Sequence, residues 1–245
     1  MSSDEHIDAS SLERIVPDQL QSSEATGSET LQLHLERYAF ATDNLIPGQV
    51  LDIACGVGYG TAMLATSKMI AHAIGVDISV AAVRFASQRY GNEKISFQCS
   101  DALTFSSNNC FENIVSLETV EHVDHPRLFF AHLASMLVPG GRLVASVPVT
   151  PSVDANPHHK SNFSVKSFRE MGDAASLLFL KSLDQVQPYN AIAIARRQEA
   201  RSANLRQNLA LFYVRNPSHL FLRLWSTLRD GFANKYLTAV WEKPR

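Results

Sequence analysis

Short apolar runs alternate with segments of helical periodicity through the middle of the chain. The apolar runs lie at residues 50–53, 72–78, 95–99, 113–117 and 142–149. Between them, residues 79–90 and 126–137 place large apolar side chains at helical spacing, with Ser79 as a capping residue and Pro126 suited to a first helical turn. Such regular alternation predicts an α/β fold with a doubly wound, mostly parallel sheet.

The flanking segments add elements at both ends of this core. Residues 30–41 have helical spacing, residues 163–171 predict a short helix, and residues 177–186 and 234–243 predict a sixth and a seventh strand. The chain is therefore expected to divide into an N-terminal helical cap, residues 1–46, and a main domain, residues 47–245. A mostly helical insertion is expected at about residues 190–231, before the last strand.

The insertion carries an apolar stripe with helical spacing, formed by Leu220, Phe221, Leu224, Trp225 and Leu228. We expect this helix to bury the stripe on its own domain. The alternatives are a homodimer contact through residues 190–231, or docking to a lipid-linked or anionic substrate. Charge is unevenly spread, since residues 195–231 carry about +5 and residues 1–30 about −6 in a chain of net charge −2.

A glycine-rich turn follows the first strand, in the sequence VLDIACGVGYGT at residues 50–61. Gly56, Gly58 and Gly60 allow positive φ and let the backbone approach a ligand without a Cβ in the way. Asp52 ends the strand at the edge where open α/β sheets bind ligands, and an acid there suits a cationic ligand. The turn predicts a nucleotide-type ligand site.

The pattern D-x-A-x-G-x-G-x-G resembles the first motif of class I S-adenosylmethionine-dependent methyltransferases, in their small-molecule branch of the type 11 and ubiquinone-biosynthesis kind. The resemblance covers about residues 49–150 and implies a Rossmann-like, seven-stranded sheet with an antiparallel last strand. It also implies that S-adenosylmethionine is the cofactor. The cofactor would contact the glycine-rich turn, the acidic residues at the ends of strands two and three together with the residue after each acid, and the residue that follows strand four. These residues are Asp52, Ala54, Gly56, Gly58, Asp77, Ile78, Asp101, Ala102 and Glu118.

The same resemblance gives the neighbouring elements roles around the cofactor. Asp77 would bind the ribose hydroxyls, and Asp101 with Ala102 would contact the adenine. N-terminal helices in this fold close over the methyl donor, so Arg37 and Tyr38 are candidates to reach its carboxylate. The other interpretation of residues 30–41 is a packing helix with a solvent-exposed Arg37.

A dinucleotide-dependent dehydrogenase is the competing Rossmann-type interpretation, because Asp77 lies 21 residues after Gly56 and can serve an NAD ribose equally well. The glycine spacing separates the two classes: a dehydrogenase uses G-x-G-x-x-G, whereas this chain has G-x-G-x-G. A dehydrogenase also has no need of Asp52 or Asp101. The pattern favours the methyltransferase.

The residues after the fourth strand are the candidates for chemistry, since they face the methyl group in this fold. His122, or His158 or His159, is a candidate general base, with Glu121 beside it, because an imidazole titrates near neutral pH. The stretch E-x-x-E-H, followed by NPHHKSNFSVKSF, is also similar to the metal-binding pattern of small-RNA 2′-O-methyltransferases.

That second similarity implies a different use of the same residues. Glu118, Glu121, His122 and His159, or His158 in its place, would hold a divalent cation such as Mn²⁺ or, less comfortably, Mg²⁺. A third interpretation is that these residues only shape the pocket. The sequence leaves the three interpretations open.

These features together predict a methyltransferase acting on a small-molecule hydroxyl. The stretch S-V-P-V-T-P…N-P-H-H…F-S, within residues 146–164, resembles methyltransferases from polysaccharide and glycosylated-metabolite pathways, which implies a sugar or polyol-type biosynthetic intermediate as the acceptor. N-methylation of a small metabolite is the nearer alternative, and a non-catalytic protein that binds the methyl donor is the more distant one. A nucleic acid partner is not expected, because the isoelectric point is about 6.5 and no aromatic and basic platform is evident.

Cysteine usage and the N-terminus bear on the compartment. An odd number of cysteines, Cys55, Cys99 and Cys110, lies in or beside predicted strands, which predicts buried, reduced thiols. The sequence has no apolar run long enough to span a membrane and no signal-peptide pattern at its N-terminus. We therefore expect a cytoplasmic protein without a transmembrane segment.

Overall fold

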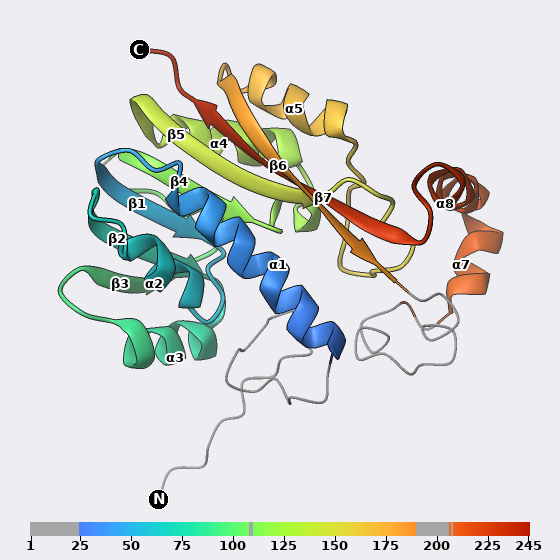
Figure 1. The fold of residues 1–245 in the computed structure, drawn as a ribbon, viewed down its shortest axis with the longest axis horizontal. Helices are drawn as coiled ribbons and strands as arrows, with labels where there is room; N and C mark the ends of the chain where they lie inside the picture. The colour runs from blue at the N-terminus through green and yellow to red at the C-terminus, as the bar shows by residue number, and fades with distance from the viewer. Residues whose placement is uncertain (1–24, 108–109, 190–205, 207) are drawn as a thin grey trace, which may run out of the picture.

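The computed structural model describes residues 25–107, 110–189, 206 and 208–245. It contains a seven-stranded sheet in the order β3-β2-β1-β4-β5-β7-β6 (Figure 1). Only β7 runs antiparallel to its neighbours β5 and β6, so the predicted mixed sheet with an antiparallel last strand is confirmed. The strands are β1 Gly48–Ile53, β2 Ile70–Asp77, β3 Ile95–Cys99, β4 Phe111–Leu117, β5 Leu137–Pro148, β6 Leu178–Pro188 and β7 Ala233–Glu242.

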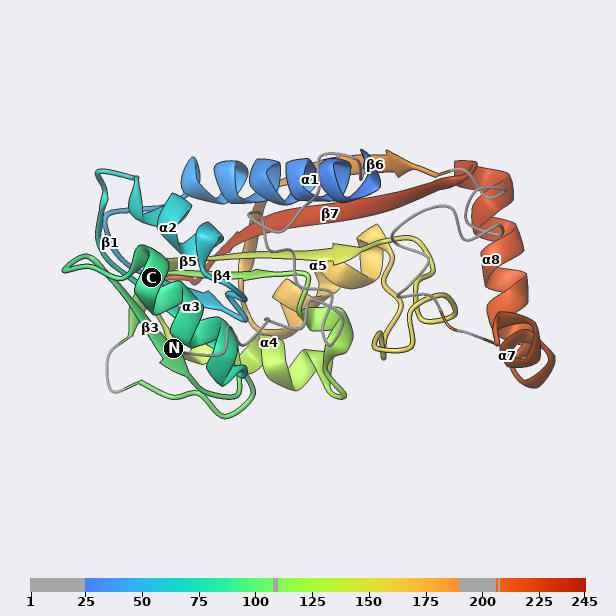
Figure 2. The same ribbon diagram turned by 90° about the horizontal axis from the view of Figure 1, so that it is seen from below.

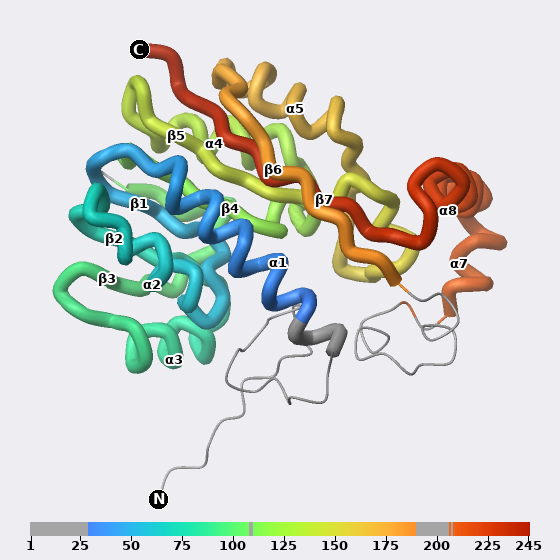
Figure 3. Tube along the Cα trace, viewed as in Figure 1, coloured from blue at the N-terminus to red at the C-terminus, as the bar shows by residue number. Residues whose placement is uncertain are grey.

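Helices connect and cover the strands, as the trace in Figure 3 follows from end to end. Residues 30–41 lie within a longer helix. Of the mostly helical insertion expected at about residues 190–231, residues 190–205 and 207 lie outside the described residues, and two helices follow residue 208. The helices are α1 Ala25–Thr42, α2 Tyr59–Ala65, α3 Val80–Tyr90, the 3₁₀ turn η2 Val120–His122, α4 Pro126–Ser135, α5 Val165–Ala174, α7 Leu209–Arg215 and α8 Pro217–Asp230.

Helix boundaries follow the capping chemistry. The Ser79 side chain accepts a hydrogen bond from the Ala82 N–H at the start of α3, as expected. Helix α4 ends at Ser135, so the predicted extension to residue 137 is wrong. Leu137 instead opens β5 and pairs with Phe111 of β4, because strand pairing across the sheet overrides the helical spacing there.

The sheet has an apolar layer on each face because successive strand residues point to opposite sides. On one face, Val115 and Val144 belong to a cluster with Tyr38 of α1 and Leu64 of α2. Figure 2 shows α1 on one side of the sheet and α4 and α5 on the other.

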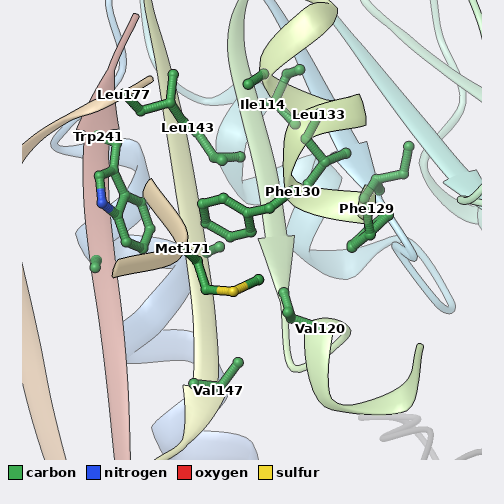
Figure 4. Packing of buried hydrophobic residues seen from close by; sticks show 14 of the residues in the cluster. Ile114, Val120, Phe129, Phe130, Leu133, Leu143, Val147, Met171, Leu177 and Trp241 are labelled. Atoms are coloured by element: carbon green, nitrogen blue, oxygen red, sulfur yellow. The ribbon is translucent and has the colours of Figure 1, made fainter. Parts of the chain in front are cut away.

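The second layer contains most of the aromatic side chains. Ile114 and Leu143, the strand neighbours of Val115 and Val144, join α4 and α5 in a larger cluster around Phe130, Phe168 and Trp241 (Figure 4). The Phe130 and Trp241 rings meet edge to face with centroids 5.1 Å apart. This rigid double layer fixes the ends of β1, β2 and β4, from which the candidate site is built.

Helix α8 has the opposite orientation to the one expected from its sequence. Among its residues only Ser226 is buried, whereas Phe221 is 67% exposed and Leu228 is 84% exposed. The expectation that the insertion buries its apolar stripe on its own domain is therefore wrong. The cause is that Arg223, on the polar side of the helix, turns inward to the buried carboxylate of Asp154.

The cysteines agree with the prediction only in part. All three thiols are free, and Cys55 is buried, but Cys99 and Cys110 are exposed. Cys99 is the last residue of the edge strand β3, and Cys110 directly precedes β4, so both cysteines lie at strand ends. Within the described residues, none of the helices has the length and apolar character needed to cross a membrane.

Candidate functional site

The glycine turn joins β1 to α2 through three residues with left-handed backbone. Ala54, Gly56 and Gly58 have φ values of 61°, 56° and 83°. A Cβ on Gly56 would meet nothing within 4 Å, whereas a Cβ on Gly58 would come within 2.6 Å of Ala86 and Phe97. Gly56 thus presents bare backbone to open space, which fits a ligand. At Gly58, packing against the protein already excludes a side chain.

Gly60 is also held by packing, because a Cβ there would run into the Tyr38 ring of α1. The Tyr38 hydroxyl reaches both carboxylate oxygens of Asp52 at 3.4 Å, and the Thr61 hydroxyl donates to Asp52 at 2.6 Å. Asp52 is 1% exposed. Burial raises the pKa of the Asp52 carboxyl to about 7, although the hydrogen bonds from Thr61 and Tyr38 act in the opposite direction.

Asp77, the last residue of β2, connects β2 to the glycine turn after β1 through hydrogen bonds of its side chain. Its two carboxylate oxygens accept hydrogen bonds from the Gly56 N–H and the Ser79 N–H, each at 2.9 Å. The next residue, Ile78, exposes 58% of its surface beside this carboxylate. The structure therefore places the Asp77 carboxylate, which is 6% exposed, against the Gly56 backbone, with Ile78 exposed directly after it.

Asp101 and Ala102 follow β3 in the corresponding position. The Asp101 carboxylate accepts a hydrogen bond from the Leu103 N–H at 2.8 Å and is partly exposed. Ala102 packs against the larger apolar cluster. Because β1, β2 and β3 are parallel neighbours, these residues lie at the same edge of the sheet as the glycine turn.

Glu118 follows β4 in a strained backbone conformation, with φ of 48°. Its carboxylate accepts a hydrogen bond from the Ser146 hydroxyl at 2.7 Å and lies 3.5 Å from the Arg37 guanidinium. Asp52 pairs with Val115 two residues before the end of β4, which places the end of β4 alongside the glycine turn. Glu118 is thus at the predicted cofactor edge, held in place from β5 and α1.

Arg37 is 1% exposed, so of its two sequence-based interpretations the solvent-exposed one is wrong. Its guanidinium donates to the Gln185 side-chain oxygen at 2.7 Å and lies over the Tyr236 ring at 4.3 Å. Ion pairing to Glu118, hydrogen bonding to β6 and stacking on β7 lock α1 across the sheet. No sequence signal identified Gln185, Ser146 or Tyr236, because their partners lie far along the chain.

Glu121, His122 and His159 converge immediately after β4. One potential ligand atom from each lies within 4.8 Å of the others, and the two imidazole rings meet edge to face at 4.7 Å. The Glu121 carbonyl accepts hydrogen bonds from the Lys160 and Ser161 N–H groups, which fastens the His159 loop to η2.

The other two candidates lie outside this group of three. Glu118 is directed to Ser146 and Arg37, so the predicted four-residue metal set is not assembled. His158 is exposed, and its backbone carbonyl lies 3.3 Å from His122 Nδ1. One carboxylate and two imidazoles can serve either as a base with its neighbours or as ligands of a divalent cation.

A family model described as "Methyltransferase domain" matches residues 51–145. The chain is 33% identical to phosphoethanolamine N-methyltransferase 1 of Arabidopsis thaliana over 142 residues, 55% of this chain and 28% of that protein. It is 26% identical to the probable tocopherol O-methyltransferase, chloroplastic, of Oryza sativa subsp. japonica over 196 residues, 76% of this chain and 52% of that protein. The chain thus spans about half or less of the length of these relatives.

Solved structures share the architecture. The YcgJ protein of Bacillus subtilis gives a TM-score of 0.67 at 17% identity, covering 86% of this chain and 100% of that one. The N-methyltransferase NodS of Bradyrhizobium japonicum WM9, in complex with S-adenosyl-L-homocysteine, gives 0.60 at 17% identity, covering 91% and 90%. Residues 51–145 thus match a methyltransferase domain, and the seven-stranded sheet that contains them has the fold of these solved structures.

Proposed function

We propose that the protein transfers a methyl group from S-adenosylmethionine to a hydroxyl oxygen of a small molecule, a sugar or another polyol-type biosynthetic intermediate. The observation that carries the proposal is the convergence of Glu121, His122 and His159 directly after β4, next to the strand ends that form the cofactor edge. The cytoplasmic location and a possible homodimer remain predictions from the sequence.

The cofactor edge supports binding of S-adenosylmethionine through residues of four strands. Gly56 offers backbone with open space beside it, Asp77 and Asp101 offer carboxylates to the ribose and the adenine, and Ile78 offers an exposed apolar surface. Asp52 and Glu118 add negative charge near a cationic ligand. When bound, S-adenosylmethionine supplies a methyl group on a sulfonium, which is already an activated leaving group.

The task left to the protein is to orient the acceptor and accept its proton. In the route we favour, the acceptor hydroxyl gives its proton to an imidazole nitrogen of His122 or His159. The Glu121 carboxylate, in the same group of three, stabilises the imidazolium that results. The backbone bonds from Lys160 and Ser161 to the Glu121 carbonyl keep the two histidines together.

A divalent cation is the second route, and the same convergence favours it. Glu121, His122 and His159 form a donor set suited to Mn²⁺ and less to Mg²⁺, and such a cation would lower the pKa of a coordinated hydroxyl. Glu118 has no part in this set. Loss of activity on chelation, restored by Mn²⁺, would select this route over the free histidine base.

N-methylation is the second candidate function, because the Arabidopsis relative at 33% identity is a phosphoethanolamine N-methyltransferase. A neutral amine is already nucleophilic and needs no general base to remove a proton before it attacks the methyl group. The two histidines would therefore contribute less to the rate of N-methylation than to that of O-methylation. A screen with radiolabelled methyl donor should therefore include both polyols or glycosides and phosphorylated amino alcohols. Methylation of the amines alone would overturn the O-methyltransferase proposal.

The mutational test replaces His122 and His159 separately by Ala. We expect kcat to fall on the order of 10²-fold or more in the variant that removes the base, with S-adenosylhomocysteine binding retained. His125→Ala is the matched control, because His125 is exposed and lies outside the group of three. Unchanged turnover in both site variants would exclude the histidines from the mechanism.

A further inference from the structure

Helix α8 faces the protein with its polar side and solvent with its apolar side. Its inward positions include Ser226, which is 7% exposed, Asp230, whose side chain is 7% exposed, and Arg223, whose side chain is 18% exposed. A surface helix of a protein that stays in water has the reverse arrangement. Since α7 and α8 project from one end of the molecule (Figure 2), this outward side is open to an external partner.

We define the apolar face of α8 as Leu220, Phe221, Leu224, Trp225 and Leu228. These residues follow one side of the helix at i, i+1, i+4, i+5 and i+8, and they expose between 38% and 84% of their surfaces. The Phe221 and Trp225 rings are stacked, with centroids 6.5 Å apart. A contiguous apolar surface of this kind marks an interaction site.

The surroundings of the apolar face are cationic. From Arg206 to Lys235 the chain carries five basic side chains and one acid, and with Asp154, which neutralises the inward-facing Arg223, this region has a net charge of +3 in a chain of net charge −2. Arg215, the last residue of α7, lies two residues before α8, and Arg229 lies in the last turn of α8; both are exposed, and Arg229 also pairs with Asp230. Apolar residues with a tryptophan, bordered by arginines, are the composition of helices that lie in a membrane interface.

Charge distinguishes an anionic lipid surface from a second copy of this chain. In a two-fold dimer the same patch meets itself, so the cationic borders of two copies would approach each other. Anionic lipid headgroups would instead pair with the arginines while the acyl chains cover the apolar residues. We infer that the apolar face of α8 docks this domain onto an anionic membrane surface.

The test uses the fluorescence of Trp225. The chain has two tryptophans, and Trp241 is fully buried, so a spectral shift on adding vesicles reports Trp225. We expect a blue shift and co-sedimentation with vesicles of phosphatidylcholine plus phosphatidylglycerol, much weaker binding to phosphatidylcholine alone, and weakening by salt. Absence of both the shift and the co-sedimentation with the anionic vesicles would overturn the inference, as would equal binding to the two kinds of vesicle.

Two triple variants make the test specific to α8. Phe221→Ser, Leu224→Ser, Leu228→Ser keeps Trp225 as the reporter and is expected to weaken vesicle binding at least about tenfold. Leu128→Ser, Leu178→Ser, Leu180→Ser removes apolar side chains that are exposed elsewhere, and is expected to bind like the wild type. Equal binding by the α8 variant would contradict the inference. A second contradicting result would be a wild-type dimer, detected by light scattering, that the α8 variant no longer forms, in a protein that does not bind vesicles. Neither result depends on turnover.

Discussion

Asp52 lies beneath the glycine turn with Thr61 and Tyr38 as hydrogen-bonding neighbours. Burial favours the neutral form of the Asp52 carboxyl and raises its pKa to about 7. A carboxyl that is protonated more readily in the folded state than in the unfolded chain lowers the stability of the folded state as pH rises. The acid is therefore retained at a cost to folding, which is consistent with a role toward a cationic ligand.

Replacement of Asp52 by Asn measures this cost. Between the unfolded pKa of 3.8 and the folded pKa of about 7, the folded wild type binds more protons than the unfolded chain, so its stability falls as pH rises. We expect the unfolding free energy of Asp52→Asn, relative to that of the wild type, to increase by up to about 4 kcal/mol from about pH 4 to about pH 8. Urea denaturation at both pH values checks this.

Asp43→Asn is the control for that series, because Asp43 is an exposed carboxylate just after α1. Its stability difference from the wild type should change little over the same range. If Asp52→Asn and the wild type keep a constant stability difference at both pH values, the Asp52 carboxyl is not held in its neutral form by burial.

At the scale of elements, the α7–α8 pair is fastened to the main domain by the loop after β5. The Arg223 guanidinium donates to both oxygens of Asp154 at 2.8 and 2.7 Å and to the Pro151 carbonyl at 2.6 Å, and the Tyr213 hydroxyl donates to Asp154 at 2.6 Å. Burial alone would raise the pKa of Asp154, but the hydrogen bonds and charge of Arg223 outweigh it and lower the pKa. This ion pair decides which side of α8 faces outward.

Removing one partner of this pair leaves a buried charge without compensation. We expect Arg223→Ala and Asp154→Ala each to destabilise the structure by about 3–5 kcal/mol, and the double variant to lose less than the sum. Thermal or chemical denaturation of the four proteins gives the coupling energy. Because the same loop carries His159, hydrogen exchange in residues 151–161 should accelerate as well.

Arg229 provides the control within the same helix. It pairs with Asp230 at 2.7 Å, but its side chain is 61% exposed, so Arg229→Ala should cost no more than about 1 kcal/mol. Additive effects of Arg223→Ala and Asp154→Ala, or a loss at Arg229 as large as at Arg223, would contradict the role assigned to the buried pair.

At the scale of the whole molecule, a ligand bound across the ends of β1, β2 and β3 stabilises the folded state, because only the folded state brings these ends together. A saturating ligand at a hundred times its Kd adds about 2.7 kcal/mol of stability. For a chain of this size we expect S-adenosylhomocysteine to raise Tm by about 5–10 °C, and NADH to leave it unchanged. Differential scanning fluorimetry makes the measurement, and the reverse pattern would point to the dehydrogenase.

Gly56→Ala should remove this stabilisation, because the new Cβ enters the open space beside the turn. Gly231→Ala is the matched control, since Gly231 also has a positive φ, 72°, and a Cβ there would likewise meet nothing within 4 Å. Both substitutions are expected to lower Tm without ligand through backbone strain, by about 1–2 kcal/mol at Gly56 and by up to about 3 kcal/mol at Gly231, whose φ of 72° and ψ of −162° lie in a region almost restricted to glycine. A full ligand shift in Gly56→Ala would place the cofactor elsewhere.

Much of the fold was predictable because its signals are local. The alternation of apolar runs and helical segments predicted the strand and helix order, and Ser79 and Pro126 marked helix starts that the structure confirms. The α4 boundary was misplaced because Met136 and Leu137 suit either element, and pairing of Leu137 with Phe111 decided between them. The exposure of Cys99 was missed because the sequence of a strand does not show that the strand lies at the edge of the sheet, and that of Cys110 because Cys110 precedes β4 and lies outside it.

The sequence by itself determined the glycine turn, the acids that follow β1, β2 and β3, and hence the kind of ligand that suits this edge of the sheet. These features depend on neighbours a few residues apart, where chain geometry leaves little choice. The tertiary structure alone decided that Arg37 is buried against Gln185, that His159 and not His158 joins Glu121 and His122, and that α8 turns its apolar face outward. Each outcome depends on a contact between residues at least 37 positions apart, as for Arg37 and Gln185 at a separation of 148, where no local pattern reports the partner.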